Sequence, residues 1–447
     1  MKTLFNFIFI LFTSIALLSC GTTDPQIPPV ETKPTLTLVP EDTSCTEAWI
    51  TLTTKDLTFP AELTLKQYNP TGDSVSQIFF LNTQDTLFYL DSLLPNQTYK
   101  LQVSSVKSQV VSNKLNITAM DTTSYDRNWQ LFYFGEHSQS LIRDIAIINE
   151  NDIWAVGEIY MNDSLGNPDA NAYNAVHWDG QSWQLLRLRF YTFCGQPNTG
   201  PYPIKSIIAF NENNIWLTSN SQITHFDGVN QLSIQCLPVS VERIWGTNDN
   251  NIYLIGANGK IAHYNGVSWS SMESGTEVDL LDIWGGSDGT LWASGYSGDY
   301  GTTVLLRNSV SSWVKVFEGS SSEQNNGFTI NLITGVWSKN IFRIYLMKSD
   351  GIFLQANQNE LFLQKRIAKF RYGSYSISGT DDNNIFVSGW RYVGHWNGIS
   401  YREYPELYQG NRDYYSIKAK GNTVCAGGSD YNGYSYSQAV IAIGIKN

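Results

Sequence analysis

The chain has 447 residues and a formal net charge of −11; charged residues make up only 15% of it, and aromatic residues reach 13%. This length exceeds what one hydrophobic core usually serves, so more than one domain is expected. The acidic balance and the lack of a dense basic run argue against nucleic acids and other polyanions as partners. Abundant aromatic residues, with loops of Asn, Ser and Gly, favour an all-β protein.

The first 19 residues have the features of an export signal. Lys2 gives a short positive segment, residues 4–18 are apolar, and the run ends in the letters LLSC at Cys20. This ending resembles the lipobox of bacterial lipoproteins, in which the cysteine is lipidated and becomes the mature N-terminus. The resemblance implies that Cys20 is a membrane anchor. An ordinary secretory signal is the alternative, and a membrane-spanning helix is disfavoured because the apolar run is too short.

Residues 20–34 contain four prolines and no periodicity, which predicts an extended tether after the lipidated cysteine. Residues 35–121 then carry seven short alternating segments in fewer than about ninety residues, which indicates a β-sandwich. The predicted strands are 35–39, 48–53, 61–68, 77–81, 86–90, 99–106 and 114–119.

Two residues refine the prediction for this sandwich. Trp49 lies on the second predicted strand and is expected to be buried in the core. The segment LLPNQTY, ending at Tyr99, resembles the corner before the sixth strand of fibronectin type III domains. That resemblance implies that the Tyr99 hydroxyl bonds back to the backbone. A generic immunoglobulin-like sandwich is the alternative.

An internal repeat fills residues 125–447. One phrase recurs four times, a strand followed by an Asx-Gly turn and an aromatic return strand: AVHWDGQSW at 175–183, ITHFDG at 223–228, IAHYNGVSW at 261–269 and VGHWNGISY at 393–401. A second segment, typified by Asn-Asn-Ile-Trp, recurs seven times, several of the intervals being 37 to 41 residues. One four-stranded propeller blade has ~40–45 residues, so the repeat predicts a seven-bladed β-propeller.

The two ends of the repeat region predict how the ring closes. The last unit ends at residues 439–444 without a fourth strand, and an unassigned strand at 129–134 precedes the first unit. Pairing these two segments in one blade removes both exposed edges. We therefore expect the termini of this region to seal the circle.

Two insertions interrupt the regular spacing, at residues 158–174 and 186–203. Loops of this length on a rigid scaffold are more often functional than connective. Of the cysteines after Cys20, only Cys194 and Cys236 are considered as a disulfide pair, because both flank one repeat.

Recurrent polar residues favour structural roles over catalysis. His177, His225, His263 and His395 occupy one position of the repeat, which indicates a hydrogen bond at the strand end, and His137 alone stands outside this pattern. The Asn/Asp clusters suit calcium ligation, but they fall where hairpins must turn, and turn formation is favoured. The sequence predicts neither a metal site nor a cofactor.

Several polar residues begin the predicted first strands, the innermost strands of a propeller. Asp144, Glu242 and Asp282 are candidate catalytic carboxylates for a glycan hydrolase or lyase. Arg143, Lys205 and Arg243 are expected in the same region, so a mixed polar channel is favoured. Trp245, Trp284 and Trp337 recur on the same strands, where packing between blades is favoured over ligand stacking.

The whole layout resembles bacterial, Bacteroidetes-type lipoproteins with an N-terminal fibronectin type III-like domain and a C-terminal propeller. The resemblance implies a cell-envelope location, in the outer membrane or at the cell surface, with membrane contact through the lipid anchor. We expect a non-enzymatic binding or scaffold protein that recognises a protein or glycan. Its candidate ligand-binding residues are Arg143, Lys205, Arg243, Trp245 and Trp284. A glycan-active enzyme is the alternative, and a periplasm-facing assembly scaffold is a third possibility.

Overall fold

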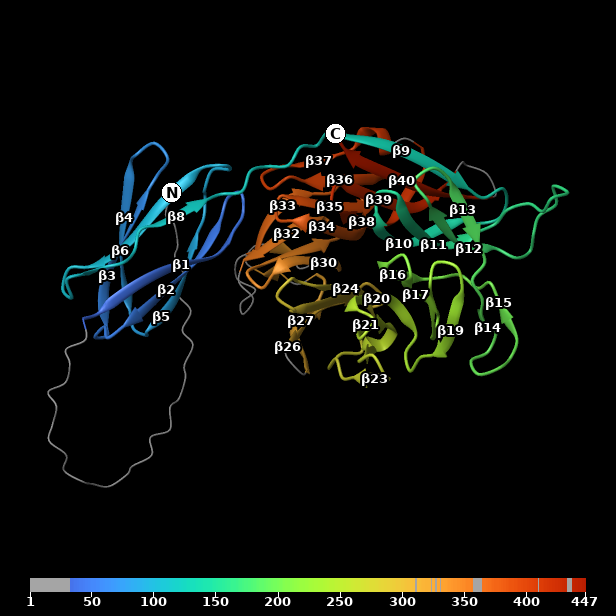
Figure 1. Cartoon of the computed structure of the whole chain (residues 1–447), viewed down its shortest axis with the longest axis horizontal. Helices are drawn as coiled ribbons and strands as arrows, with labels where there is room; N and C mark the ends of the chain where they lie inside the picture. The colour runs from blue at the N-terminus through green and yellow to red at the C-terminus, as the bar shows by residue number, and fades with distance from the viewer. Residues whose placement is uncertain are drawn as a thin grey trace, which may run out of the picture. The chain divides into compact units, whose positions relative to one another are not determined.

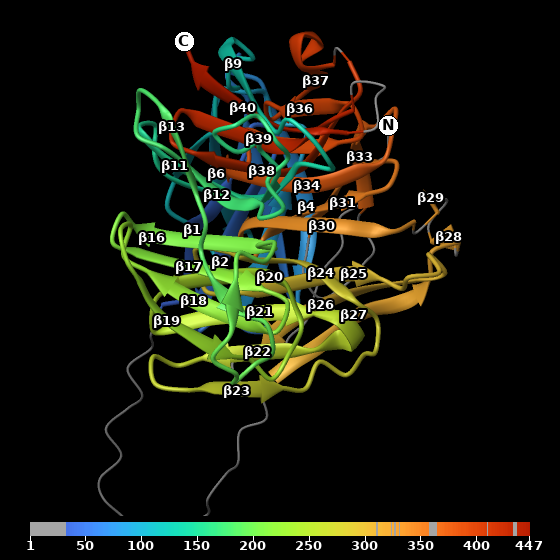
Figure 2. The ribbon, with the colours of Figure 1, turned by 90° about the vertical axis from the view of Figure 1, so that its right-hand side faces the viewer.

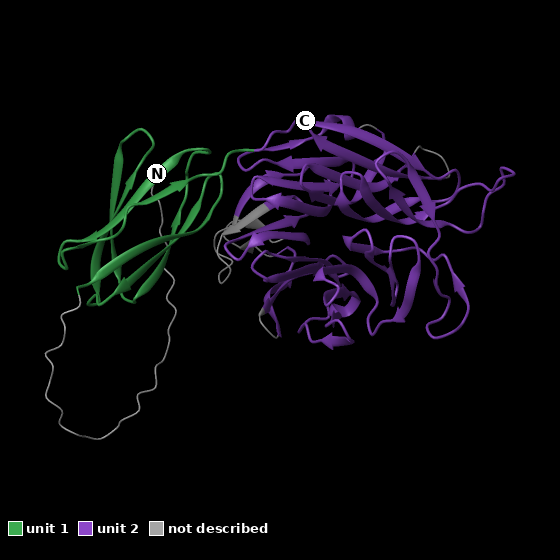
Figure 3. Ribbon diagram, in the orientation of Figure 1, with its two compact units in different colours: residues 1–122 green, residues 123–447 purple. Residues whose placement is uncertain are grey.

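The computed structural model describes residues 33–309, 312–322, 324–325, 328–329, 331–356, 364–408, 410–431 and 436–447. The predicted signal, Cys20 and most of the tether lie outside the described residues. The chain divides into two compact units, Met1–Thr122 and Thr123–Asn447 (Figures 1 and 3). In the described part, the regular structure is all β apart from two 3₁₀ turns, η1 (Ala257–Gly259) and η2 (Pro405–Leu407).

Unit 1 is built from two antiparallel sheets that enclose an aliphatic core, as expected for a sandwich. One sheet has the order β1 (Thr35–Thr43), β2 (Ala48–Lys55), β5 (Asp85–Leu90). The other has the order β4 (Ser74–Leu81), β3 (Ala61–Tyr68), β6 (Thr98–Ser105), β7 (Val110–Val111), with β8 (Leu115–Thr118) also paired to β6. Alternation along each strand sends every second side chain inward, and the predicted strands all have a counterpart.

The structure confirms the predicted role of Tyr99 in unit 1 but places Trp49 differently from the prediction. The backbone N–H of Leu94 donates to the Tyr99 hydroxyl over 2.8 Å, so the predicted corner is confirmed. Trp49 is buried, with 6% of its surface exposed, but it does not belong to the core cluster for which it was predicted. It lies on the other side of β2 from Ile50, however, because neighbouring residues of a strand face opposite ways, and its ring contacts that of Tyr89 at 4.8 Å.

The described residues of unit 2 form seven four-stranded antiparallel sheets. In chain order, the first six are β10 (Leu141–Asn149), β11 (Asp152–Ile159), β12 (Tyr173–Trp178), β13 (Trp183–Leu186); β16 (Ser206–Asn211), β17 (Asn214–Ser219), β18 (Gln222–Phe226), β19 (Gln231–Cys236); β20 (Val241–Asn248), β21 (Asn251–Gly256), β22 (Ile261–Tyr264), β23 (Trp269–Met272); β24 (Leu280–Gly285), β25 (Leu291–Tyr296), β26 (Thr302–Ser309), β27 (Ser312–Ser320); β30 (Ile333–Asn340), β31 (Arg343–Lys348), β32 (Gly351–Ala356), β33 (Gln364–Lys369); and β34 (Ser374–Asp381), β35 (Asn384–Gly389), β36 (Tyr392–Trp396), β37 (Tyr401–Glu403).

The seventh sheet joins the two ends of unit 2. It has the order β38 (Arg412–Lys420), β39 (Thr423–Asp430), β40 (Gln438–Lys446), β9 (Arg127–Phe134). Strands β9 and β40 are antiparallel, with Leu131 opposite Ala442, and lie side by side in Figure 1. The predicted pairing of the segment at Trp129 with the tail is therefore confirmed.

The first strands of successive sheets lie beside one another. Figure 2 shows sheets following one another from β16–β19 through β20–β23 to β24–β27. Contacts run from β10 to β16, β20, β24, β30, β34 and β38 in turn, and β38 also contacts β10. The series thus returns to its start, which is a propeller-like arrangement.

Aromatic side chains of the first strands fill the space between sheets. A Cβ atom at Gly285 would collide with the Trp245 ring, and one at Gly379 would collide with the Trp337 ring. Each of these glycines therefore makes room for the aromatic side chain of another first strand. This packing is the role that the sequence favoured for the recurrent tryptophans.

The recurrent histidines stack on the second strands. His177, His225, His263 and His395 each lie opposite an aromatic residue, with ring centroids 4.1–4.4 Å apart. Nε2 of the first three lies 2.8–3.0 Å from an Asp or Asn side chain that begins the second strand. Their predicted structural role is confirmed. His395 instead contacts Tyr404, and burial lowers its pKa to about 3.

Candidate ligand-binding face

A β-bulge recurs near the start of the first strands. In the described chain, six of the seven first strands shift register at this point, and only β16 does not. A bulge redirects the side chains on either side of it. The residues left unpaired by the six bulges are Arg143, Glu242, Leu281, Thr334, Tyr375 and Tyr415.

Asp144 follows the first bulge and is held by several strands at once. Its side chain is 1% exposed and accepts hydrogen bonds from the hydroxyls of Ser206, at 2.5 Å, and Ser416, at 2.9 Å. Arg243 lies 3.4 Å away and Lys418 3.8 Å away. Burial acts to raise the pKa of Asp144, but these two cations and the hydrogen bonds outweigh it, so the pKa lies below its usual range.

Asp282 belongs to the same charged group but has fewer partners. The backbone N–H of Val336 donates to it over 2.9 Å, and Arg243, Lys418 and Asp144 all influence its charge. The carboxyl lies deep among protein atoms, although part of its surface stays accessible. Desolvation therefore outweighs the two cations and the hydrogen bond, and the pKa of Asp282 rises to about 6. The structure therefore brings Asp144, Arg243 and Asp282 together, as the sequence predicted.

The other charged candidates form separate pairs. Glu242 is paired with Lys205, and Arg143 with Glu158 at 2.7 Å. With cations beside each carboxylate, the geometry fits the mixed polar region that was favoured. The catalytic roles of Asp144, Glu242 and Asp282 stay predictions.

Trp245 and Trp284 lie between sheets. The Trp245 ring packs against Gly285. The indole N–H of Trp284 donates to the carbonyl of Ser338 over 2.6 Å, and its ring lies 6.1 Å from that of Trp337. These contacts leave ligand stacking by the two tryptophans without support.

Eight other aromatic residues gather where the first strands begin and the second strands end, and we name them the aromatic belt. Five of them connect the sheets of β24, β34 and β38. The rings of Tyr296 and Tyr300 are 5.6 Å apart, and those of Tyr375 and Tyr415 5.2 Å apart. The Tyr415 hydroxyl lies 3.1 Å from that of Tyr431. Desolvation and the charges of Asp413, Tyr296, Tyr431 and Tyr300 raise the pKa of Tyr375 to about 12, so the two pairs of rings lie within electrostatic range of each other.

The remaining three members of the belt are Tyr372, Trp390 and Tyr408. The Tyr372 ring lies 5.6 Å from that of Trp390 and 6.5 Å from that of Tyr408. The backbone of Trp390 pairs with that of Asp413, which links this group to the other five. Sequence reasoning missed the belt. Aligning the first strands would have given one signal, since Tyr375 and Tyr415 occupy the same bulge position.

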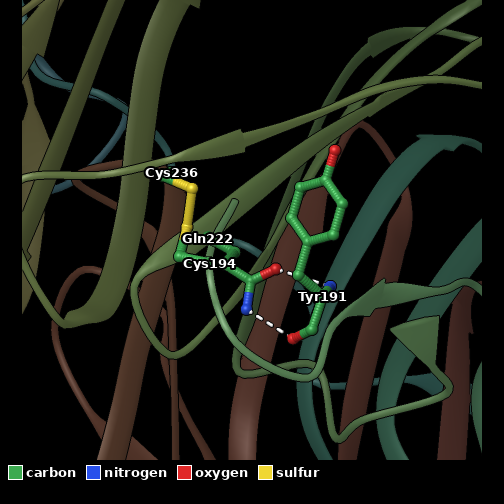
Figure 4. The surroundings of a disulfide bond; sticks show 4 residues. All are labelled: Tyr191, Cys194, Gln222 and Cys236. Carbon is green, nitrogen blue, oxygen red and sulfur yellow. Dashed lines mark hydrogen bonds between the residues drawn. A yellow bond between two sulfur atoms is a disulfide. The ribbon is translucent and has the colours of Figure 1, made fainter. Parts of the chain in front are cut away.

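The second insertion is fastened to the second sheet of unit 2. Cys194 and Cys236 form a disulfide with Cα atoms 5.9 Å apart (Figure 4), so the considered pairing is confirmed. Beside it, the backbone N–H of Tyr191 donates to the Gln222 side chain over 2.8 Å, and the Gln222 amide donates to the Tyr191 carbonyl over 2.9 Å. A short hairpin, β14 (Phe190–Tyr191) with β15 (Thr199–Gly200), orders the loop.

The Asn/Asp clusters cap their own turns. The side chains of Asn149, Asn211 and Asn248 each accept a hydrogen bond at 2.9 Å from the backbone N–H two residues later. This is the favoured turn role. Within the described residues, no group of three or more His, Cys, Asp or Glu side chains is arranged to hold a metal ion. The same residues contain no helix long and apolar enough to cross a bilayer.

One cavity of about 190 Å³ lies between the first two sheets of unit 2, at their turns. Two of its polar groups are already engaged, since Nε2 of His177 is 2.9 Å from the Asp152 carboxylate. Its lining residues are Asp152, Trp154, His177, Glu212, Asn213, Asp227, Gly228 and Val229.

Comparisons with known proteins show similarity of fold alone. No family model and no curated protein matches the chain. The structure described as "YCF48 bound to D1 peptide" has a TM-score of 0.52 at 14% identity, covering 73% of this chain and 97% of that one. The extracellular domain of the one-component system BT4673 from B. thetaiotaomicron has a TM-score of 0.49 at 12% identity, covering 71% of this chain and 40% of that one. The chain is thus an all-β protein whose larger unit has a propeller-like fold.

Proposed function

We propose that this protein is an exported binding protein, anchored to a bacterial envelope membrane through Cys20, that recognises a protein or glycan on one face of a seven-bladed propeller. The seven sheets, the contact of β38 with β10 and the pairing of β9 with β40 support the closed ring. The fibronectin type III-like unit serves as a spacer between anchor and propeller.

The aromatic belt is the observation that carries the binding role. Tyr300 is 62% exposed, Trp390 48% and Tyr375 40%, and they belong to one group of neighbouring rings. Large aromatic side chains left in water on a folded surface are typical of recognition sites. A propeller-like neighbour is described as bound to a peptide, which supports a binding role for this architecture.

The enzymatic alternative has weaker support. Glycoside hydrolysis uses two carboxyl groups roughly 5–10 Å apart that are free to exchange protons and reach the sugar. Asp144 is enclosed and hydrogen-bonded, and Arg243 lies close to both aspartates. This arrangement favours a structural use of the charges.

Capture on intact cells tests the binding role. The wild-type chain and a Tyr300→Ala/Trp390→Ala variant are each crosslinked to their surroundings and purified. We expect a protein or polysaccharide that the wild type retains and the double variant loses. Equal retention by both chains would contradict recognition through the belt.

Fatty-acid labelling tests the anchor. We expect the wild type to incorporate labelled palmitate and the Cys20→Ala variant to incorporate none. Equal labelling of both chains would rule out Cys20 as the anchor. Digestion of intact cells with a protease separates the two locations, because a surface protein is removed and a periplasm-facing scaffold is protected.

A further inference from the structure

Four tyrosines of the aromatic belt have their hydroxyl groups engaged with one another in pairs. The hydroxyls of Tyr372 and Tyr408 are 3.2 Å apart, and the Tyr415 hydroxyl lies 3.1 Å from both Tyr431 and Ser429. Burial raises the pKa of Tyr415, so this side chain stays neutral at physiological pH. Because the hydroxyl tips are engaged, these side chains offer an incoming molecule mainly ring surface.

The belt extends across several sheets. Tyr300 lies in the connection between β25 and β26, Tyr375 lies in β34, and Tyr431 follows β39. A ligand that contacts all three spans the starts of several first strands. An extended chain with repeated units fits such a surface better than a single compact molecule.

Two charged residues, Asp413 and Arg391, lie within the belt, and each is partly exposed. Asp413 lies close to Tyr375 and Tyr415, and Arg391 lies close to Asp413. Oδ1 of Asp413 and Nε of Arg391 are enclosed by protein atoms, so the other polar atoms of these two side chains are the ones available to a ligand. An acceptor and a donor beside exposed rings suit a ligand that supplies both kinds of group, as a hydroxyl does.

The composition of the belt's loops favours a neutral and hydroxyl-rich ligand. Residues 297–301, 371–373, 390–391, 410–413 and 430–431 contain no Leu, Ile, Val or Met. They contain three Arg and three Asp residues, so their formal charges cancel. An aliphatic pocket, which would take an apolar anchor of a protein partner, is therefore not provided by these segments.

From these observations we propose that the aromatic belt binds a neutral glycan chain, with the rings stacking on the apolar C–H faces of successive sugars and Asp413 and Arg391 bonding to their hydroxyls. This inference rests on the proposed binding function and assigns its ligand class. Recognition by stacking suits a polysaccharide, because every pyranose presents an apolar face whatever its linkage.

Affinity electrophoresis of the full chain in detergent tests the assignment. The gels contain a β-1,4-glucan, a β-1,3-glucan, an α-1,4-glucan, a β-mannan or a xylan, and a printed array of neutral and acidic glycans extends the set. We expect at least one neutral glycan to retard the wild type. Tyr300→Ala and Tyr375→Ala should each weaken binding at least about tenfold, as loss of a central aromatic contact does. Asp413→Asn should weaken it less.

Phe193→Ala is the matched control, because Phe193 is 72% exposed in the second insertion, outside the belt, and its variant should bind like the wild type. Thermal unfolding of each variant confirms that the fold is retained. A wild type that no neutral glycan binds, or retardation that Tyr300→Ala and Tyr375→Ala leave unchanged, overturns the proposal. If a protein partner is instead lost by the belt variants while no glycan binds, the glycan assignment fails and the proposed binding function stands.

Discussion

Asp144 and Asp282 show how neighbours decide the cost of an internal charge. Asp144 accepts two hydroxyl hydrogen bonds and has two cations nearby, so its negative charge is stabilised. Asp282 has one backbone donor and shares the same cations with Asp144. The charged form of Asp282 is therefore less stable in the protein than in water. For this reason the pKa of Asp282 is raised while that of Asp144 is lowered.

This difference predicts the effect of pH on an Asp282→Asn variant. The folded-state pKa of Asp282 is raised from 3.8 to about 6, so its ionisation removes stability as pH rises through this window. The variant should match the wild type near pH 4 and exceed it at pH 7.5, by at most about 3 kcal/mol before solvent screening. Urea unfolding at both pH values measures the difference.

A variant at an exposed carboxylate serves as the control. Glu150 is exposed in the turn between β10 and β11. Glu150→Gln should therefore change the unfolding free energy only slightly, and by the same amount at both pH values. An Asp282→Asn variant that is less stable than the wild type at pH 7.5 would show that the charge is needed to hold Arg243 and Lys418.

At the scale of elements, the second insertion is a loop fastened to two sheets. The disulfide joins Cys194 to Cys236 at the end of β19, and the Gln222 side chain binds the backbone of Tyr191. These contacts connect the loop to the second sheet. The Asn174 side chain, in β12 of the first sheet, bonds to the backbone near both ends of the loop, at Leu188 and Tyr202. The loop should therefore keep one position relative to both sheets.

Removing the disulfide should loosen this loop selectively. In Cys194→Ser, we expect faster amide hydrogen exchange in residues 190–200 and a loss of about 2–4 kcal/mol of unfolding free energy, because the unfolded chain is no longer constrained. Cys236→Ser should give the same result, and a reducing agent should reproduce it in the wild type. Unchanged exchange would show that the Gln222 contacts suffice.

Local patterns and repetition made most of the elements predictable. The Asx-Gly phrase gave the hairpins between third and fourth strands. Its four histidines all stack on an aromatic residue of the second strand because each sheet repeats one register. The charged cluster at Asp144 followed from its place on a first strand. The ion pair of Glu242 with Lys205 was not foreseen, because Glu242 is a bulge residue and a bulge redirects the side chains around it.

The aromatic belt was harder to foresee for a physical reason. Tyr300, Tyr372 and Tyr431 lie in connections of different sheets and have no common spacing in the sequence. They become neighbours only because the sheets are arranged around one another. The sequence of one repeat therefore gives no sign that its tyrosine will lie near those of other repeats.

At the scale of the whole molecule, unit 2 depends on the contact between its two ends. Each of the first six sheets is made from one continuous segment of chain, whereas the seventh needs β9 from the start and β38–β40 from the end. Without β9, the backbone of β40 would be an open edge.

A designed crosslink tests this closure. Leu131 and Ala442 lie opposite each other on β9 and β40. We expect Leu131→Cys/Ala442→Cys to form a disulfide under mild oxidation and to raise the unfolding free energy by up to about 5 kcal/mol, because it closes a very long loop. Leu131→Cys alone supplies the uncrosslinked control. Absence of the crosslink in the folded protein would refute the pairing.

The strand shared by both ends also constrains how the polypeptide matures. β9 precedes β40 along the chain and reaches the place of folding first, so the earlier segment must wait without its hydrogen-bonding neighbour. Truncated or prematurely terminated products cannot finish the seventh sheet at all. Such fragments should be bound by chaperones and degraded by proteases more readily than full-length molecules.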